Sequence, residues 1–326
     1  MQDDKQNWQP TASLANLTKR AQILAKIRNF FAARDILEVE TPLLSNATIT
    51  DPVLHSFSTC YTGPGAARGK TLYLQTSPEF AMKRLLAAGS GPIYQICKAF
   101  RNDELGRHHN PEFTMLEWYR PGFDHHDLMN EMDELLQWVL GCESAERFSY
   151  QQIFLRHAKL DPHNASSEDL RQTAKAHGIE IPSLELDNKD SWLHLLMSHV
   201  IEPHLGQKNP CFIYDYPATQ AALAQVRPGK PPLAERFEVY VKGIELANGF
   251  HELSDAKEQH RRFAYELEER KPLGLPIVPM DYNLLAALEH GIPDCAGVAL
   301  GLDRLVMLAC NAQSLQEIIS FPVDRA

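Results

Sequence analysis

Apolar residues near the amino terminus recur at helical spacing. The recurring positions are Leu17, Ala21, Leu24, Ile27 and Phe31. Because one face of an α-helix repeats every three to four residues, this pattern predicts an amphipathic helix over residues 14–33. Pro42 disfavours a helical conformation at Thr41, so we expect a short strand over residues 37–41 after the helix.

Two strand-like segments, residues 92–101 and 112–119, flank a polar loop that contains two adjacent histidines. They predict an antiparallel hairpin with a long connection. Side chains alternate along a strand, so Phe113, Glu117 and Tyr119 should share one face of the second strand.

The segment before this hairpin predicts a loop, a strand and a helix. Residues 51–70 contain three glycines and lead into strand-like residues 71–75. Ser77 is expected to cap the short helix that follows, with Pro78 at its first position.

The second half of the chain predicts helices and strands without a strand–helix–strand rhythm. A helix capped by Asp124 precedes a helical insertion over residues 141–210, with a capping box from Ser166 to Asp169 and a stop at Gly178. The later elements are expected as strands at 237–242 and 244–252 with a bulge at Gly243, a helix at 254–270, a strand at 294–300 and a helix at 302–310. We expect one α+β domain over residues 1–326, an antiparallel sheet flanked by helices.

Composition narrows the class of protein. The 326 residues are 44% apolar and 23% charged, which is ordinary for a globular protein, and the net charge of -10 disfavours broad nucleic-acid binding. The chain has no apolar run near the roughly 20 residues that span a bilayer, and its first residues include two acids. A cytoplasmic protein without membrane contact is expected, with six reduced core cysteines.

The histidines do not predict a zinc site. His108–His109 and His125–His126 are adjacent pairs, and His194, His199 and His204 lie five residues apart. Spacing of five places successive side chains on different helix faces, and the chain has no H-E-x-x-H sequence.

Three ordered segments carry signatures of chemistry. Residues 100–117, from Phe-Arg-Asn-Asp-Glu to Met-Leu-Glu, resemble the second signature motif of class II aminoacyl-tRNA synthetases. Residues 297–305 (GVALGLDRL) resemble the third motif, and residues 34–42 the first. Residues 76–79 (TSPE) and 245–253 (ELANGFHEL) are similar to the amino-acid pocket of lysyl-tRNA synthetases.

The resemblance is to a truncated branch of that family. A lysyl-tRNA synthetase carries an anticodon-binding OB domain before motif one, whereas here motif one closes at Pro42. The chain is therefore similar to the lysyl-tRNA synthetase paralogues that attach lysine or (R)-β-lysine to a lysine of elongation factor P. The resemblance implies an amino-acid adenylate, an amide product, elongation factor P as acceptor, a homodimer formed through motif one, and no tRNA binding.

The residues themselves suit carboxylate activation by ATP. Arginine presents a fixed fork of donors to phosphate oxygens, which makes Arg101 and Arg304 the candidate catalytic residues. By resemblance, the ATP-binding residues are Arg101, Asn102, Asp103, His109, Asn110, Phe113, Glu245, Leu246, Gly301 and Arg304. Mg²⁺ prefers oxygen ligands, and Glu238 and Glu245 are the implied pair.

Carboxylates also suit a diamine substrate. By resemblance, the amino acid is bound by Ser77, Pro78, Glu79, Glu117, Tyr119, Asn248, Phe250, Glu252 and Ala299. Glu252 and Tyr119 are expected at the distal ammonium, and Glu79 and Ser77 toward the other amine. Asp103 stands where motif two usually has Glu, and Ala299 where lysyl-tRNA synthetases have Gly.

Two other functions fit the same motifs. One is a compact lysyl-tRNA synthetase that charges RNA, which the acidic charge and the missing OB domain disfavour. The other is a regulatory module that senses an amino acid or a nucleotide without chemistry. Such modules commonly lose the phosphate-binding arginines, whereas Arg101 and Arg304 are present here.

For the dimer, motif one is expected to supply an apolar surface. The sequence places Phe30, Phe31, Ile36 and Leu37 together beside the predicted edge strand. Such a cluster suits an isologous contact between two copies of the chain.

Overall fold

The computed structural model describes residues 8–179 and 188–326, which form two compact units. Unit 1 comprises Met1–Gly122, Ser254–Asp294 and Ala299–Ala326, and unit 2 comprises Phe123–Leu253 and Cys295–Val298. The single domain therefore stays a prediction, while the helical insertion at 141–210 lies wholly within unit 2.

Unit 1 begins with the predicted amphipathic helix, α1 (Leu14–Ala32), which starts where the Ser13 side chain accepts a hydrogen bond from the Asn16 amide. Phe31 is fully buried, and its ring stacks on Tyr94 at 4.3 Å between centroids. Phe30 and Ile36 are also buried. Three of the four residues expected on an apolar dimer surface thus pack inside their own unit, so that expectation was wrong for them.

Two long strands of unit 1 form the predicted hairpin. β5 (Ile93–Phe100) and β6 (Glu112–Pro121) pair antiparallel, from Ile93 opposite Tyr119 to Phe100 opposite Glu112. β1 (Leu37–Glu38) is shorter than expected and pairs parallel with β5, so the sheet is mixed and not purely antiparallel. Sequence periodicity reports which face a strand buries but not which direction its neighbour runs.

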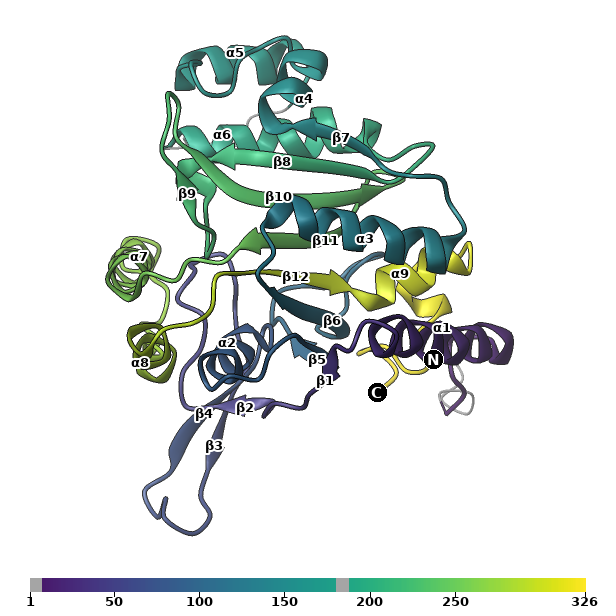
Figure 1. The fold of residues 1–326 in the computed structure, drawn as a ribbon, viewed down its shortest axis with the longest axis vertical. Helices are drawn as coiled ribbons and strands as arrows, with labels where there is room; N and C mark the ends of the chain where they lie inside the picture. The colour runs from purple at the N-terminus through teal and green to yellow at the C-terminus, as the bar shows by residue number, and fades with distance from the viewer. Residues whose placement is uncertain (1–7, 180–187) are drawn as a thin grey trace, which may run out of the picture. The chain divides into compact units, whose positions relative to one another are not determined.

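A second, three-stranded sheet of unit 1 has the order β2 (Leu44–Ser45), β4 (Lys70–Leu74) and β3 (Ser58–Tyr61), as Figure 1 shows. β4 confirms the predicted strand, whereas β2 and β3 lie outside the predicted strands. β3 is exposed along its whole length and therefore lacks the apolar alternation of a half-buried strand. Its Cys60 thiol is exposed, and Gly69, at φ +80°, passes close to that sulfur.

The remaining helices of unit 1 are α2 (Glu79–Ala87), α7 (Ala256–Arg270), α8 (Tyr282–His290), α9 (Leu302–Ala309) and the 3-10 turn η5 (Leu315–Glu317). Of these, α2, α7 and α9 lie where the sequence predicts them or within a residue or two, whereas α8 and the turn η5 were not predicted. Ser77 does not occupy the N-cap position of α2, which belongs to Pro78. Its Oγ still accepts a hydrogen bond from the Glu79 amide at 3.0 Å, so the serine serves the first turn from one position earlier.

Unit 2 contains the sheet order β11 (Ile244–His251), β10 (Leu233–Val241), β8 (Cys211–Pro217) and β7 (Glu146–Ser149), with β9 (Val226–Arg227) beside β10. β7 and β8 run parallel, and the other pairs are antiparallel. The bulge expected at Gly243 was wrong. Lys242 and Gly243, at φ 53° and 73°, form the two-residue turn between β10 and β11, and the register shift lies between Val239 and Tyr240.

The helices of unit 2 confirm the predicted caps. α3 (His125–Leu140) begins with a capping box at Asp124 and ends at Gly141 in the left-handed region. The insertion contains α4 (Tyr150–His157), α5 (Ser167–Ala176), α6 (Lys189–Leu196), the π-helical turn η2 (Met197–Ile201) and the 3-10 turn η3 (Glu202–His204), with a further 3-10 turn, η4 (Ala218–Gln220), after β8. The predicted box from Ser166 to Asp169 opens α5. These helices share a core with β8 that includes Phe154, Trp192 and Ile213.

The last strand, β12 (Cys295–Gly301), belongs to unit 2 up to Val298 and to unit 1 from Ala299. The helices and mixed sheets confirm the α+β class. All six cysteines are free thiols, of which Cys211 and Cys295 are buried, but the expectation of core cysteines fails for the exposed Cys60. Among the described helices, none combines the length and apolar character needed to cross a membrane.

Candidate active site

The predicted site residues fall into two sets, one in each unit. The unit 1 set includes Arg101, which follows β5 and whose amide donates to the Pro111 carbonyl at 2.9 Å, closing the long loop. Its Nη1 donates to Glu104 at 3.0 Å, and the guanidinium lies 5.2 Å from the Phe113 ring centroid. The Arg101 Nε is buried and has no hydrogen-bond partner among the described residues. A buried N–H without an acceptor indicates a place for a ligand oxygen.

Arg304 lies in the first turn of α9 and contacts the same loop. Its Nη2 lies 2.6 Å from His109 Nε2, and its Nε donates to the His108 carbonyl at 3.2 Å. Burial and the neighbouring Arg304 lower the pKa of His109, despite Glu104 nearby. A neutral His109 can accept a hydrogen bond from Arg304. Arg101 and His109 both lie beside Glu104, and Arg304 lies beside His109, so the structure brings these three predicted nucleotide residues together.

Glu104 is a residue that sequence reasoning missed. Its carboxylate contacts Arg101 and lies 3.9 Å from His109 Nε2. The spacing of three between Arg101 and Glu104 was the available signal. Asp103, the predicted residue beside it, instead lies 3.3 Å from His55 Nδ1, and Asn102 is exposed. Their roles toward a nucleotide stay predictions.

Asn110 has both ends of its side-chain amide engaged by the protein. Its Nδ2 donates to the Glu112 carbonyl at 2.6 Å, and its Oδ1 accepts from the Val323 amide at 3.1 Å. The residue is buried, and these two bonds join the loop before β6 to the carboxyl-terminal segment. They give Asn110 a role in shaping the loop, while direct contact with ATP remains a prediction.

The predicted amino-acid residues of unit 1 form a hydrogen-bonded group around Glu117. This buried carboxylate accepts from Ser77 Oγ at 2.7 Å and from the Tyr119 hydroxyl at 2.6 Å. Glu117 and Tyr119 share a face of β6, as strand alternation predicted. A buried carboxylate held by two hydroxyl donors favours a cationic ligand over a neutral one.

Lys83 is a second residue that the sequence analysis missed. It is only 1% exposed, and its ammonium lies 2.6 Å from Glu79, one helical turn earlier in α2. Glu79 was expected to meet a substrate amine, so that amine would share this carboxylate with Lys83. The i,i+4 spacing of the two residues was visible in the sequence, but burial was not.

Ala299 and Gly301 lie on the unit 1 part of β12, and Gly301 occupies the N-cap position of α9. Asp303 follows in the first turn of that helix, and its Oδ2 accepts from the Thr114 amide of β6 at 2.8 Å. This bond fixes the start of α9 against β6. Arg304, the next residue, takes its position from the same turn.

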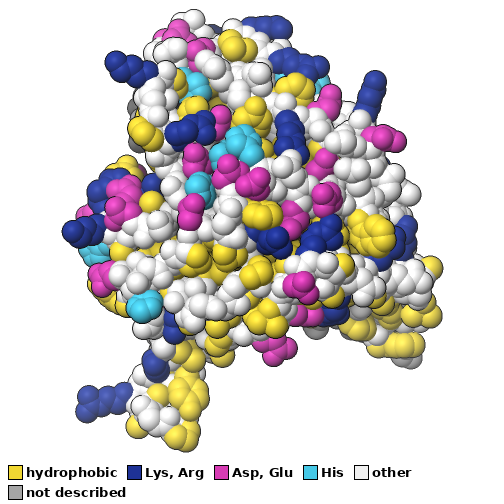
Figure 2. Space-filling model, viewed as in Figure 1, with side chains coloured by type: hydrophobic (Ala, Val, Ile, Leu, Met, Phe, Trp, Pro, Cys, Tyr) yellow, Lys and Arg dark blue, Asp and Glu magenta, His cyan; other side chains and the backbone are white. Residues whose placement is uncertain are grey.

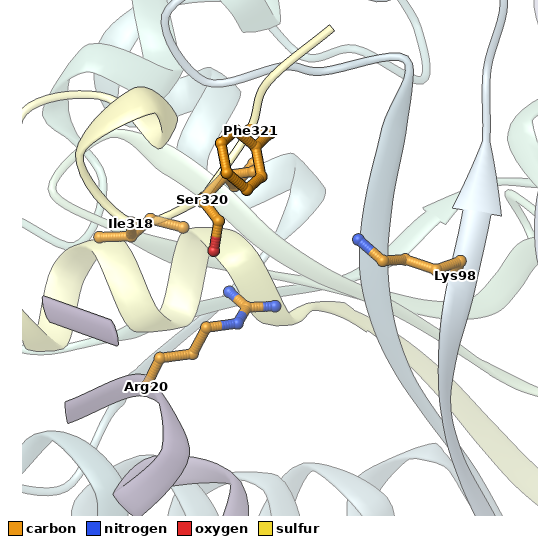
Figure 3. A pocket seen from close by; sticks show the side chains of 6 residues that line it. Arg20, Lys98, Ile318, Ser320 and Phe321 are labelled. Carbon is orange, nitrogen blue, oxygen red and sulfur yellow. The ribbon is translucent and has the colours of Figure 1, made fainter. Parts of the chain in front are cut away.

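A small pocket of unit 1 lies apart from these residues. It is lined by Arg20, Lys98 and residues 318–321, and Figure 3 shows both basic side chains turned toward Ser320. None of the predicted site residues lines it. The pocket therefore adds nothing to the assignment of the nucleotide or amino-acid residues.

The unit 2 set centres on Glu238, which is buried in β10. Its carboxylate accepts from the Tyr216 hydroxyl at 2.6 Å, from Tyr240 and from Arg236. Burial raises the pKa of Glu238, but Arg236 and the two tyrosines outweigh it, so the pKa lies below its ordinary value and the group is ionised. Since both oxygens already have donors, a Mg²⁺ ion would have to displace one of them, and this assignment stays a prediction.

Arg236 was also missed by the sequence analysis. Besides Glu238, its guanidinium donates to Asn248 Oδ1 at 3.2 Å and to the Gln220 carbonyl at 2.8 Å. It also lies 6.0 Å from the ring centroid of Phe250. Two predicted residues of β11, Asn248 and Phe250, are therefore organised by one arginine of β10.

The other predicted residues of unit 2 lie along β11 and just after it. Glu245 is half-buried opposite Tyr240, Leu246 is buried, and Glu252 is 2% exposed. The Glu252 amide donates to the Cys295 carbonyl at 2.9 Å, and its own carbonyl accepts from Gln225. These backbone bonds hold the Glu252 carboxylate in place at the end of the strand.

The fold and these residues define the class of protein. The family model of class II tRNA synthetases (D, K and N) matches residues 7–325, and the chain belongs to that family. Within the family, curated relatives carry one name. The chain is 58% identical over 320 residues, 98% of both chains, to the elongation factor P--(R)-beta-lysine ligase of Pectobacterium carotovorum. It is 57% identical to the proteins of that name from Edwardsiella ictaluri, over 99% of both chains, and Salmonella typhi, over 98% of both chains.

Proposed function

We propose that the protein is an ATP-dependent ligase that activates lysine or (R)-β-lysine as an adenylate and transfers it to a lysine side chain of elongation factor P. The observation that carries this proposal is the identity of 57–58% over nearly the whole chain to ligases of that name. The relatives are also covered almost completely, so the shorter length compared with a lysyl-tRNA synthetase is shared by them.

Two bond exchanges make up the proposed reaction. A carboxylate oxygen of the amino acid bonds to the α-phosphorus of ATP as the bond to pyrophosphate breaks. The amine of the acceptor lysine then bonds to the carbonyl carbon, loses a proton, and AMP leaves. Negative charge grows on phosphate oxygens in the first exchange, which is where fixed guanidinium donors stabilise a transition state.

Arg101 fits the phosphate of ATP on an observation independent of the family, because its buried Nε lacks a partner among the described residues. Phe113, 5.2 Å from the same guanidinium, is suited to the adenine ring. Arg304 and His109 are the further phosphate contacts that we propose. A hard cation such as Mg²⁺ takes carboxylate oxygens, and Glu245 suits it better than Glu238, whose oxygens already accept from three donors.

Charge supports a substrate with two amines. In unit 1, Glu117 and Glu79 offer carboxylates, with Lys83 neutralising one of them. In unit 2, Glu252 offers a third. Following the family resemblance, we propose that Tyr119 and Glu252 meet the distal ammonium, that Ser77 and Glu79 serve the other amine, and that Glu117 adds negative charge for the cationic substrate. Pro78, Asn248, Phe250, Leu246 and Gly301 complete the proposed contacts.

The names of the relatives support the proposed acceptor, and the resemblance to the synthetase family supports the rest of the proposed setting. The acceptor is elongation factor P, the enzyme is a cytoplasmic homodimer, and tRNA is not a substrate. The net charge of -10 agrees with a protein acceptor, since a net negative protein repels a polyanionic RNA.

ATP/pyrophosphate exchange across an amino-acid panel tests the proposal before any acceptor is chosen. We expect exchange with (R)-β-lysine and more weakly with α-lysine, and transfer of labelled β-lysine to elongation factor P. Absence of exchange with every amino acid would instead favour a non-catalytic sensor. Label on bulk tRNA and none on elongation factor P would favour the compact synthetase.

A further inference from the structure

A cluster of two histidines and a glutamate lies in unit 2, among residues that the proposed reaction does not use. His125 is the first residue of α3, Glu235 lies in β10, and His251 ends β11. One side-chain ligand atom from each lies within 4.8 Å of the other two. In sequence the three residues are up to 126 positions apart, so adjacent-histidine patterns do not reveal them.

The cluster faces away from the predicted amino-acid residues of these strands. Arg236 and Phe250 are paired across β10 and β11, and Glu235 and His251 each lie one residue from that pair. Because neighbouring side chains point to opposite sides of a sheet, Glu235 and His251 lie on the other face from Arg236 and Phe250. Figure 1 shows α3 running alongside β10 and β11. His125, at the start of α3, lies with Glu235 and His251.

His125 is the least satisfied side chain of the group. It is 1% exposed, and neither ring nitrogen has a hydrogen-bond partner among the residues that the structure describes. Asp215 Oδ1 lies 3.8 Å from His125 Nε2, which exceeds hydrogen-bond distance. A buried imidazole without partners loses its hydration without compensation, and a bound cation is one group that can use its lone pair.

The other two members are already in contact. His251 Nδ1 lies 2.6 Å from Glu235 Oε2, a charge-assisted geometry in which the shared proton lies where a metal would bind. The surroundings hold both signs of charge. Asp215 adds a second carboxylate, and Arg227, whose side chain is 41% exposed, lies 2.9 Å from Asp215 and 3.3 Å from Glu235. In Figure 2, histidine and acidic side chains gather over β8 and β10.

We propose that His125, Glu235 and His251 bind a divalent transition-metal ion, with zinc as the ion that fits best. Two imidazoles and one carboxylate are a ligand set that zinc accepts, and Asp215 or water can take the fourth position. Mg²⁺ is not the expected ion, because it prefers an all-oxygen shell.

Binding requires small movements and the transfer of one proton within the His251 ring. Zinc bonds to nitrogen and oxygen are about 2 Å long, so His251 and Glu235 separate slightly while His125 moves inward. In the neutral His251 ring the proton moves by way of solvent from Nδ1 to Nε2, and the Nδ1 lone pair binds the metal. The contact between Arg227 and Glu235 breaks as the Arg227 side chain turns toward solvent, while Arg227 keeps its contact with Asp215.

The test is zinc binding to the full chain after treatment with a chelator, followed by competition with a chromophoric chelator in the presence of excess Mg²⁺. We expect one zinc per chain, with affinity reduced by about 100-fold or more in His251→Ala and Glu235→Gln, at least the loss typical for groups that only support ligands. Cobalt substitution should give the visible absorption of a four-coordinate nitrogen and oxygen site. Arg227→Gln should bind zinc more tightly, because a competing positive charge is removed.

The matched control is His204→Ala, which removes an exposed histidine of the same unit that stacks on His157 at 5.2 Å. It should bind zinc like the wild type. The proposal would be overturned if the wild-type protein bound no zinc. It would also be overturned if the zinc affinity were equal in His251→Ala, Glu235→Gln and His204→Ala. Glu235→Gln is nearly isosteric and keeps an acceptor for His251, so it decides the question even if His251→Ala loses its helical circular dichroism.

Discussion

The guanidinium of Arg20 lies 2.6 Å from the carboxylate of Asp303. The same arginine donates to the Thr114 hydroxyl at 2.8 Å, and Asp303 accepts from the Thr114 amide. Asp303 is 2% exposed and precedes Arg304, while Thr114 follows Phe113. An ion pair anchored on α1 therefore ties together the two segments that carry proposed nucleotide residues.

Asp303→Ala is expected to lower the free energy of unfolding by about 3 kcal/mol, because it leaves the largely buried Arg20 guanidinium without its counter-ion. Urea unfolding measures the change. The control is Arg28→Met, which breaks an exposed pair with Glu38 and should cost no more than about 1 kcal/mol. Equal effects of the two substitutions would show that the pair does not anchor α9.

Arg101→Ala and Arg304→Ala should each reduce adenylate formation roughly 100-fold or more, as the loss of a preorganised donor to developing charge does. ATP/pyrophosphate exchange with (R)-β-lysine measures the effect. Arg107→Ala is the control, since Arg107 lies exposed in the same loop and its Nε donates to the neighbouring His108. Rates within about threefold of the control would remove both arginines from the mechanism.

Ala299→Gly should raise kcat/KM for α-lysine relative to β-lysine by about tenfold, because one methyl-sized group typically changes selectivity roughly 10- to 200-fold. The side chain of Ala299 stands where lysyl-tRNA synthetases have glycine, and its methyl should favour the isomer whose amine is displaced by one carbon. Glycine in a strand also costs roughly 0.5–1 kcal/mol of stability, so thermal unfolding accompanies the kinetics. An unchanged ratio in a folded variant would mean that the methyl only packs.

Glu266 on α7 should make stability depend on pH. Burial raises its pKa from the ordinary 4.5 to about 7, although the Thr50 hydroxyl donates to it. Below pH 4.5 both folded and unfolded chains hold the proton. Between 4.5 and 7 the unfolded chain releases it first, so the folded state loses stability as pH rises through this window.

Glu266→Gln should therefore be more stable than the wild type at pH 8, by roughly 1–3 kcal/mol, and similar to it near pH 4.5. Glu258→Gln is the control with opposite sign. Arg261 and Arg262 beside Glu258 lower its pKa to about 2, so its contribution is present above pH 4.5 and lost on acidification. Denaturant midpoints of the two variants are compared with wild type at both pH values. If the two variants shifted in the same direction at each pH, the raised pKa assigned to Glu266 would be contradicted.

The homodimer expected from motif one should sediment near 74 kDa, twice the chain mass of 36.9 kDa. Of the apolar residues near motif one, Leu37 and Leu44 remain 56% and 43% exposed. Leu37→Asp should shift the equilibrium to monomer, because a charge in an isologous contact meets its own copy. Leu273→Asp, which alters a leucine that is 63% exposed elsewhere in unit 1, should not. Wild-type monomer at micromolar concentration with full activity would end the proposal.

Local signals predicted the elements that local physics decides. The cap at Asp124 and the box at Ser166 involve residues up to three apart, and the β5–β6 hairpin follows from alternation on both sides of one loop. The β10–β11 turn shows the limit of this reasoning. Gly243 was correctly marked as special, but a bulge and a two-residue turn both favour glycine, and only the pairing of the flanking strands separates them.

The candidate site could be predicted where a motif lies in one segment. Sequence placed Arg101, His109 and Phe113 together, but not the buried Lys83 against Glu79 or Arg236 against Glu238. Such charged pairs form because both side chains are buried together. The periodicity of a sequence does not show whether a single polar residue is buried. The same reason hid the grouping of His125 with His251, which depends on a helix crossing strands far along the chain.

The exposed β3–β4 hairpin offers a practical handle, because it carries the only cysteine that the described part of the chain exposes. Burial raises the pKa of Cys97 and Cys211 to about 12, and also raises that of Cys142 and Cys310, whereas Cys295 is fully enclosed. A maleimide fluorophore at neutral pH should therefore load one dye per chain at Cys60. A dye at Cys60 needs no engineered cysteine. Energy transfer from this dye to a second dye on elongation factor P can then follow the approach of the two proteins in real time.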